Sequence, residues 1–173
     1  DFTSRRLSST EFPAEDRIEA VREIYGRAIL HLDVEPLPDS PFQVDMTLRA
    51  LPGLSIAVGD TSHVRCRRTS ELIDSDDFLL TAVLSGGCVV TQRGREARIE
   101  EGQAVLTTNA ETSVHAYCQD SRFMNVRLPL NMVASLTDLF TALMRPVPRD
   151  TQALQLLVNY VKALRDLDQL ATP

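Results

Sequence analysis

The stretch Thr91–Leu106, TQRGREARIEEGQAVL, reverses direction twice, once at Gly94 and once at Gly102. Glycine adopts the positive φ of tight hairpin turns without a steric penalty. The stretch therefore predicts consecutive antiparallel strands joined by two tight turns of one sheet.

The same pattern extends over residues 42–128, where short segments rich in β-forming residues alternate with Gly, Pro, Asn, Asp and Ser. Short strands at regular spacing are typical of a sandwich or barrel. We therefore expect strands at Gln43–Ala50, Leu54–Gly59, Val64–Thr69, Phe78–Leu84, Cys88–Gln92, Glu96–Ile99, Gln103–Thr107, Val114–Cys118 and Phe123–Leu128.

Helical patterns flank this region. Pro13 favours the start of a first helix, whose apolar residues recur at helical spacing until the prolines at 36, 38 and 41. After Pro129, Met132 to Leu143 read as an amphipathic helix, and a last helix runs from Asp150 or Thr151 to about Asp168. We divide the chain into an arm and helix (1–41), a β region (42–129) and a helical segment (130–173).

The last helix carries two apolar stripes on different sides. One consists of Leu154, Leu157, Val158, Val161 and Leu164 and can cover the β region. The other needs a further partner, either elements of its own domain or a second subunit. This second stripe is the candidate dimer interface: Leu156, Tyr160, Ala163 and Leu167.

Composition excludes several classes of function. With 18 basic and 24 acidic residues the net charge is -6, which opposes direct binding to nucleic acid. The three cysteines form no CxxC pair and are odd in number, which fits a reducing cytoplasm. No apolar run reaches the ~20 residues of a membrane span, so we expect no membrane partner.

The order of these elements and several phrases resemble the amino-terminal sensor domain of AraC-type transcription regulators in its cupin-like form. The phrases are RIEAVREIYGRAILHLDVEPLPDSPF, TLRALPGLSIAVG, RTSELI, VLSGGCVVTQRGREARIEEGQAVL, VRLP, LMRPVPRDT and LATP. The resemblance covers nearly the whole chain and rests on their order and spacing.

The resemblance implies an α+β, mainly β domain: a cupin-like double-stranded β-barrel, or jelly roll, with an N-terminal helix and C-terminal helices. It also implies a small-molecule effector of unknown class, a homodimer, and DNA binding only through a helix-turn-helix region farther toward the carboxyl end. Since the chain opens on Asp1 and stops at Pro173, we expect it to be part of a longer regulator.

Metal-dependent cupin enzymes share this fold and provide the alternative. Their ligand set needs two histidines one residue apart on a strand, a carboxylate and a third histidine. The sequence has His31, His63 and His115 and no HxH, and it has no GxSxG elbow or phosphate loop. We therefore expect no metal, no cofactor and no catalysis, with a ligand-free oligomerisation domain as a further alternative.

Candidate effector contacts follow from strand alternation. Val64 and Cys66 share a face, and period two places Arg68 on the same inward face. A buried guanidinium needs a partner, which is either an anionic or hydroxyl-bearing effector or a carboxylate such as Glu71 or Asp76.

Other candidates come from four further strands. Arg122 and Met124 lie on the face of the last strand that we expect to point inward. His115 and Tyr117 either line a pocket or lie on the surface, and both alternatives stay open. Two threonines amid apolar strands complete the candidate ligand-binding set: Arg68, Thr81, Thr107, His115, Tyr117, Arg122 and Met124.

Overall fold

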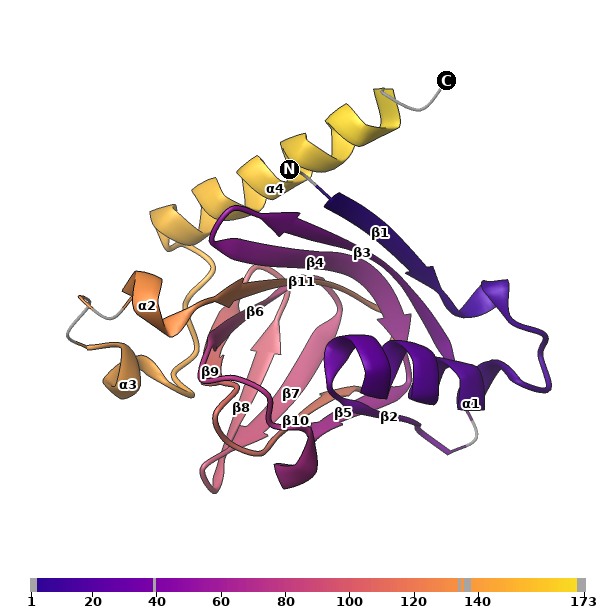
Figure 1. Ribbon diagram of the computed structural model, residues 1–173. Helices are drawn as coiled ribbons and strands as arrows, with labels where there is room; N and C mark the ends of the chain where they lie inside the picture. The colour runs from indigo at the N-terminus through magenta and orange to yellow at the C-terminus, as the bar shows by residue number, and fades with distance from the viewer. Residues whose placement is uncertain (1–2, 39, 134, 136–137, 171–173) are drawn as a thin grey trace.

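The computed structural model describes residues 3–38, 40–133, 135 and 138–170, and it describes side chains within these ranges only between residues 4 and 163. All nine expected strands are present, and two more precede them (Figure 1). The six-stranded sheet has the order β1 (Thr3–Ser8), β3 (Gln43–Leu51), β4 (Leu54–Ser62), β11 (Ser121–Leu128), β6 (Phe78–Ser85) and β9 (Ala104–Thr108). The five-stranded sheet has the order β2 (Asp33–Pro36), β5 (Val64–Arg68), β10 (Ser113–Tyr117), β7 (Gly87–Gln92) and β8 (Arg95–Glu100).

The two sheets pack face to face as a jelly roll, which confirms the expected fold class. Every recorded strand pairing is antiparallel. In the described ranges no strand of one sheet pairs with a strand of the other, so the barrel is not closed by hydrogen bonds. Ala104 at the β9 edge instead exchanges two backbone hydrogen bonds with Val147, which covers part of that exposed edge.

The opening stretch folds as predicted at its first turn and differently at its second. Arg93 and Gly94 have φ of 57° and 67° and join β7 to β8 as a tight hairpin. At Gly102, φ is 81°, but the chain there leaves one sheet for the other. The expectation of two turns within one sheet was wrong, because β9 pairs with β6 and not with β8.

The N-terminal arm is a strand. It forms β1, which pairs with β3, and Leu7 is only 1% exposed. A 3-10 turn, η1 (Ser9–Glu11), leads to α1 (Arg17–Ala20), which continues as η2 (Val21–Leu30). The η2 segment is wound as a π-helix and ends at His31 with φ of 53°.

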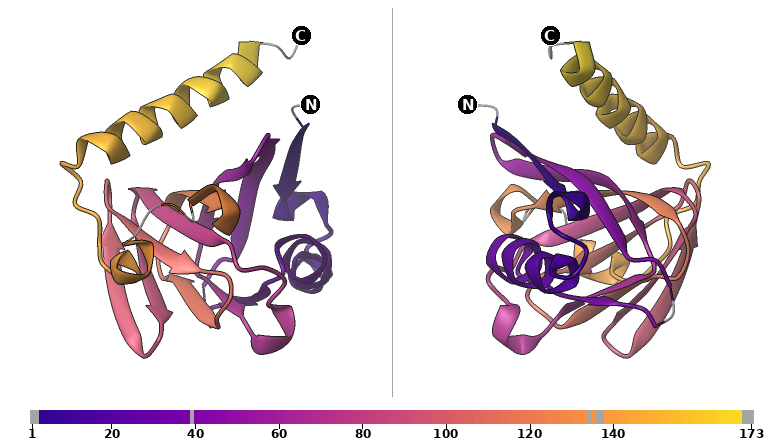
Figure 2. Two further views of the ribbon diagram at one scale, coloured as in Figure 1. Left: turned by 60° about the vertical axis from the view of Figure 1, so that its left-hand side comes forward. Right: turned by 90° about the vertical axis from the view of Figure 1, so that its right-hand side faces the viewer.

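Further helices lie outside the sheets. The long helix α4 (Gln152–Leu170) crosses the outer face of the six-stranded sheet (Figures 1 and 2), where Leu154 and Val161 pack against buried side chains of that sheet. Ahead of it, the expected single helix is divided into α2 (Leu130–Val133) and α3 (Leu139–Ala142). A 3-10 turn, η3 (Ser70–Leu72), follows β5.

Within the described residues, no helix is both long enough and apolar enough to cross a membrane.

Candidate ligand-binding cavity

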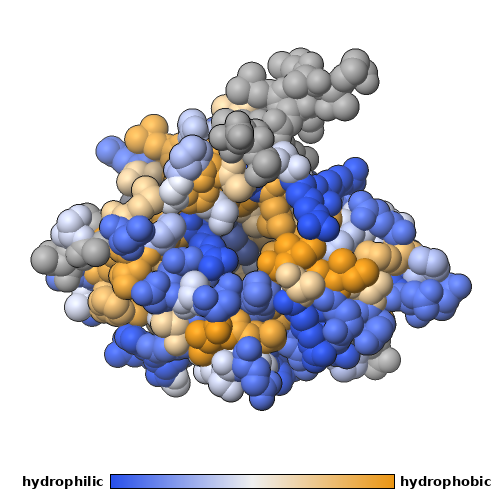
Figure 3. Space-filling model, in the orientation of Figure 1, coloured by the Kyte–Doolittle hydropathy of each residue, from blue (hydrophilic) through white to orange (hydrophobic). Residues whose placement is uncertain are grey.

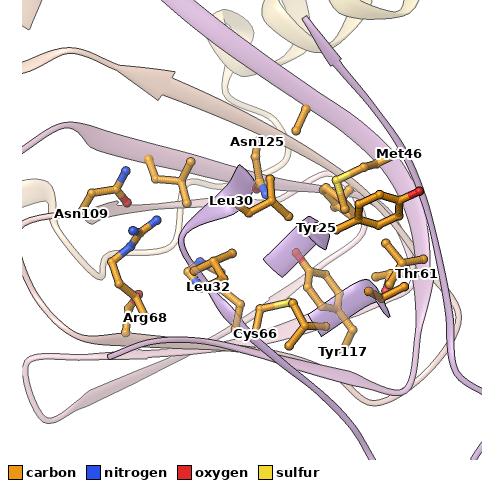
Figure 4. Close-up of a pocket in the computed structure, with 18 residues that line it drawn as sticks. Tyr25, Leu30, Leu32, Met46, Thr61, Cys66, Arg68, Asn109, Tyr117 and Asn125 are labelled. Carbon is orange, nitrogen blue, oxygen red and sulfur yellow. The ribbon is translucent and has the colours of Figure 1, made fainter. Parts of the chain in front are cut away.

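A cavity lies between the two sheets, beside η2. Its volume is about 80 Å³, within a hollow whose empty space, mouth included, is about 750 Å³. Figure 3 shows the molecular face hollowed near its centre, where polar and apolar side chains meet. Eighteen residues line the cavity, and they come from both sheets, from η2, from the segment that follows it and from the loop after β9 (Figure 4).

Most of the lining is hydrocarbon. The apolar residues come from η2, the following segment and both sheets: Val21, Leu30, Leu32, Val34, Val44, Met46, Ala57, Leu79 and Phe123. An apolar wall with a few convergent polar groups is typical of a small-molecule site.

Arg68 is the charged group of the cavity and is 4% exposed. Its Nη1 donates to the carbonyl oxygens of His31 and Leu72, each at 3.1 Å, and to Oδ1 of Asp74 at 3.3 Å. Burial lowers the pKa of the guanidinium, and the Asp74 carboxylate opposes that effect. The carboxylate partner is therefore Asp74, in place of the two acidic residues expected from the sequence.

Asp74 connects Arg68 to the outside of the domain. Its other oxygen, Oδ2, lies 3.5 Å from Nη2 of Arg127 and 3.7 Å from Nε2 of His31. Arg127 is also paired with Asp77 through its Nε. The segment between η3 and β6 thus joins the end of η2 to the cavity.

Two amides also belong to the polar lining. The Oδ1 atom of Asn125 is buried and has no hydrogen-bond partner in the described part of the chain. Asn109 is buried, and Figure 4 shows its side chain at the same end of the cavity as Arg68. A buried acceptor without a donor is costly, which makes the Asn125 oxygen a natural point for ligand contact.

His115 and Tyr117 point inward from β10 and line the cavity, so of the two alternatives left open by the sequence, pocket or surface, the structure has the pocket. The Nε2 atom of His115 lies 3.3 Å from Oγ1 of Thr81. Burial, followed by the charge of Arg68, lowers the pKa of His115 to about 4. The imidazole is therefore neutral at neutral pH.

The aromatic end of the cavity is built by Tyr117, Phe123 and Tyr25. The ring centroids of Tyr117 and Phe123 are 5.7 Å apart. Burial raises the pKa of Tyr117 well above its usual value, and it raises the pKa of the adjacent Cys66 thiol to about 12. Both groups are consequently uncharged.

The remaining expected site residues lie elsewhere. The expectation that Arg122 and Met124 face the cavity was wrong: Arg122 forms an exposed pair with Asp60, at 2.7 Å, and Met124 packs beneath α4. Thr81 touches His115 but does not line the cavity, and Thr107 donates to the carbonyl of Leu79 at 3.3 Å.

Sequence reasoning missed Tyr25, Asn109 and Asn125 as lining residues. Asn125 is the one that a pattern could have found, since it is the lone amide on an otherwise apolar or paired strand face. Tyr25 belongs to the first helix, whose periodicity gave no sign of a cavity, and Asn109 carried no periodic signal.

The candidate dimer interface is exposed where it is described. Leu156 and Tyr160 are 71% and 56% exposed, and Ala163 is exposed as well. The side chain of Leu167 lies outside the described residues. Large apolar groups on the outward side of a helix commonly mark an interaction surface.

The histidines do not converge. His31 ends η2, His63 precedes β5 and His115 faces Thr81. Among the residues that the structure describes, no three His, Cys, Asp or Glu side chains come together as a metal site would require.

Fold and cavity together define a cupin-like jelly-roll domain with an internal hollow. The chain belongs to the AraC-binding-like domain family, whose model matches residues 21–172. Comparison with curated proteins gives no match.

Solved structures agree at the level of the fold. The AraC-like transcriptional activator CuxR is similar with a TM-score of 0.77 and 16% identity, over 95% of this chain and 60% of CuxR. The chain therefore spans about three fifths of that protein's length. Lesser similarity extends to the Clostridium difficile EutQ protein (TM-score 0.43, 13% identity, 55% of this chain and 75% of that one). It also extends to the Cnp3 cupin domain of Schizosaccharomyces pombe (TM-score 0.43, 11% identity, 55% of this chain and 72% of that one).

Proposed function

We propose that this domain binds a small effector and forms dimers as the non-catalytic sensor of a bacterial, cytoplasmic AraC-family transcription regulator. Transcription would be controlled through a separate C-terminal helix-turn-helix region, which alone would contact DNA. Family membership supports the regulator class. The single observation that carries the sensing role is the apolar hollow with the inward Arg68 and the unpartnered oxygen of Asn125.

Two contacts offer routes from the cavity to the rest of the domain. Tyr25 lines the cavity, donates to Oε2 of Glu11 at 2.6 Å and accepts from the Ser8 N–H at 3.3 Å, which ties η2 to β1. Arg68 ties the cavity to the end of η2 through the carbonyl of His31. An effector that binds one arrangement of these elements more tightly than another shifts the equilibrium between the two arrangements. The size of the shift is limited to the difference between its affinities for them.

Thermal-shift screening against sugars, carboxylates, aromatic acids and lipids tests the sensing role. At a hundredfold excess over its Kd, a true effector stabilises the fold by about 3 kcal/mol, which raises Tm by roughly 6–12 °C for a domain of this size. Ala57→Leu fills the cavity and should abolish the shift, whereas Ala50→Leu on exposed β3 backbone should leave it unchanged.

Absence of a shift with every compound class would contradict the sensing role. A shift that survives Ala57→Leu would contradict the cavity as its location. An oligomerisation domain without a ligand is the function that would then remain.

A further inference from the structure

We infer that the effector is a small amphipathic monocarboxylate, with its carboxylate on Arg68 and its apolar body directed toward Tyr117. This inference deepens the proposed sensing function and rests on it. It follows from the unpaired edge of Arg68, the charge of the cavity, its shape, and the position of Asn125.

The first observation is which nitrogen of Arg68 is used. All three hydrogen bonds of its guanidinium to described residues come from Nη1. The Nε and Nη2 atoms have no partner in that part of the chain, although Arg68 lines the cavity and is 4% exposed. These two atoms form a parallel pair of donors that can donate to both oxygens of a carboxylate.

The second observation is the charge available to a ligand. Arg68 is the one permanently charged side chain among the eighteen that line the cavity. His115 is neutral because its pKa is lowered to about 4, and Cys66 is neutral because its pKa is raised to about 12. Because Arg68 already shares its charge with Asp74, the cavity suits at most one further anionic group, and a phosphate dianion would bury an additional negative charge without a partner.

The third observation is the length of the hollow. Arg68 pairs with Ser113 at one end of β10, and Val64 pairs with Tyr117 at the other. Four residues of strand separate the two levels by about 13 Å. Figure 4 shows Arg68 and Asn109 at one end, with Tyr25, Met46 and Tyr117 at the other. A carboxylate with an aryl-alkyl or medium alkyl body spans this distance, and because it is larger than the enclosed volume of about 80 Å³, it would also occupy part of the hollow of about 750 Å³.

The fourth observation concerns Asn125, which lies between the two ends in Figure 4. Its buried Oδ1 lacks a donor among the described residues, so a hydroxyl or N–H on the ligand body would satisfy it. The natural effector is therefore an acid that carries one donor group, while a simple acid is sufficient for the test.

Asp74 and the carboxylate of a bound acid would compete for the charge of Arg68. Its Oδ1 shares Arg68 with the incoming carboxylate, and its Oδ2 already faces Arg127 and His31. A bound acid thus weakens the hold of Arg68 on the segment between η3 and β6. That segment contacts the end of η2, so the same competition carries the signal outward.

Calorimetry with 4-phenylbutanoate, its amide and its alcohol tests the inference at pH 7.5. The acid should bind at least about tenfold more tightly than either neutral analogue. Arg68→Met should weaken binding of the acid by about tenfold or more and leave that of the amide nearly unchanged. Arg122→Met, which removes an exposed arginine already paired with Asp60, serves as the matched control and should behave as wild type.

Asp74→Asn provides a second test that keeps Arg68 in place. Removal of a negative charge beside the bound carboxylate should tighten binding of the acid about threefold or more and leave that of the amide unchanged. This variant decides the matter if Arg68→Met does not fold.

Equal binding of acid and amide, or an Asp74→Asn variant with unchanged affinity for the acid, would overturn the monocarboxylate class. If neutral compounds then bind and Ala57→Leu blocks their binding, the sensing function is retained and only the monocarboxylate class is rejected. If compounds of every class fail to bind, both proposals fall together.

Discussion

His115 of β10 and Thr81 of β6 meet across the interior of the jelly roll, with Nε2 of the imidazole 3.3 Å from Oγ1 of the hydroxyl. One residue belongs to the five-stranded sheet and the other to the six-stranded sheet. Both side chains are buried, and the contact is a polar link between the layers next to the cavity.

The first prediction concerns pH. The folded-state pKa of His115, about 4, lies below its ordinary value of 6.5, so the unfolded chain binds a proton more readily. The neutral, buried imidazole therefore contributes to the free energy of unfolding. This contribution is complete above pH 6.5 and is lost as pH falls toward 4, and the total loss is roughly 3 kcal/mol at most. Arg68 is the nearby charge that adds to the effect.

Denaturant unfolding of wild type and His115→Gln between pH 7.5 and 4 measures that loss. Wild type should lose more unfolding free energy than His115→Gln as the pH falls from 7.5 to 4. Parallel curves would show that the imidazole is not buried in its neutral form.

The second prediction concerns Asn125. Replacement by the nearly isosteric leucine removes a buried acceptor that lacks a partner, so Asn125→Leu should stabilise the ligand-free domain by about 1 kcal/mol or more. The exposed Asn131→Leu should stay within about 0.5 kcal/mol of wild type. Thermal unfolding distinguishes the two, and a destabilised Asn125→Leu variant would contradict the assignment of the amide.

The third prediction concerns the link between η2 and β1. Tyr25→Phe keeps the ring, whose centroid is 5.3 Å from that of Phe12, and removes the hydroxyl that contacts Glu11 and Ser8. The loss should cost about 1–2 kcal/mol and speed amide hydrogen exchange in residues 3–8. Tyr160→Phe is the control, and equal exchange in both variants would argue against the link.

The fourth prediction concerns dimerisation. A charge at Tyr160, which is 56% exposed on the outward stripe of α4, should weaken self-association of the domain about 30-fold or more. Gln155→Glu adds the same charge on the flank of the helix and should leave the dimer intact. Sedimentation of Tyr160→Glu at the rate of the wild-type dimer would exclude this stripe as the interface.

The strands could be predicted from the sequence because turn-forming residues separate each strand from the next. Gly94, for example, sits at positive φ in the hairpin that its position predicted. The polar arm was not recognised as β1, because an edge strand needs only backbone partners and one buried side chain, Leu7.

Strand faces were harder to assign where both are covered. On β5 only one face is buried, so alternation correctly placed Arg68 inward. On β11, α4 buries Met124 on the outer face while Phe123 and Asn125 line the cavity, so hydrophobicity favoured the wrong side. A long-range partner such as α4 leaves no mark on the local period of a strand.

The most direct measurement is a crystal structure of the domain grown with saturating 4-phenylbutanoate. We expect density between the two sheets, with both carboxylate oxygens on Nε and Nη2 of Arg68 and the phenyl ring beside Tyr117. A hollow filled by side chains, or the acid bound only on the outer surface, would contradict it.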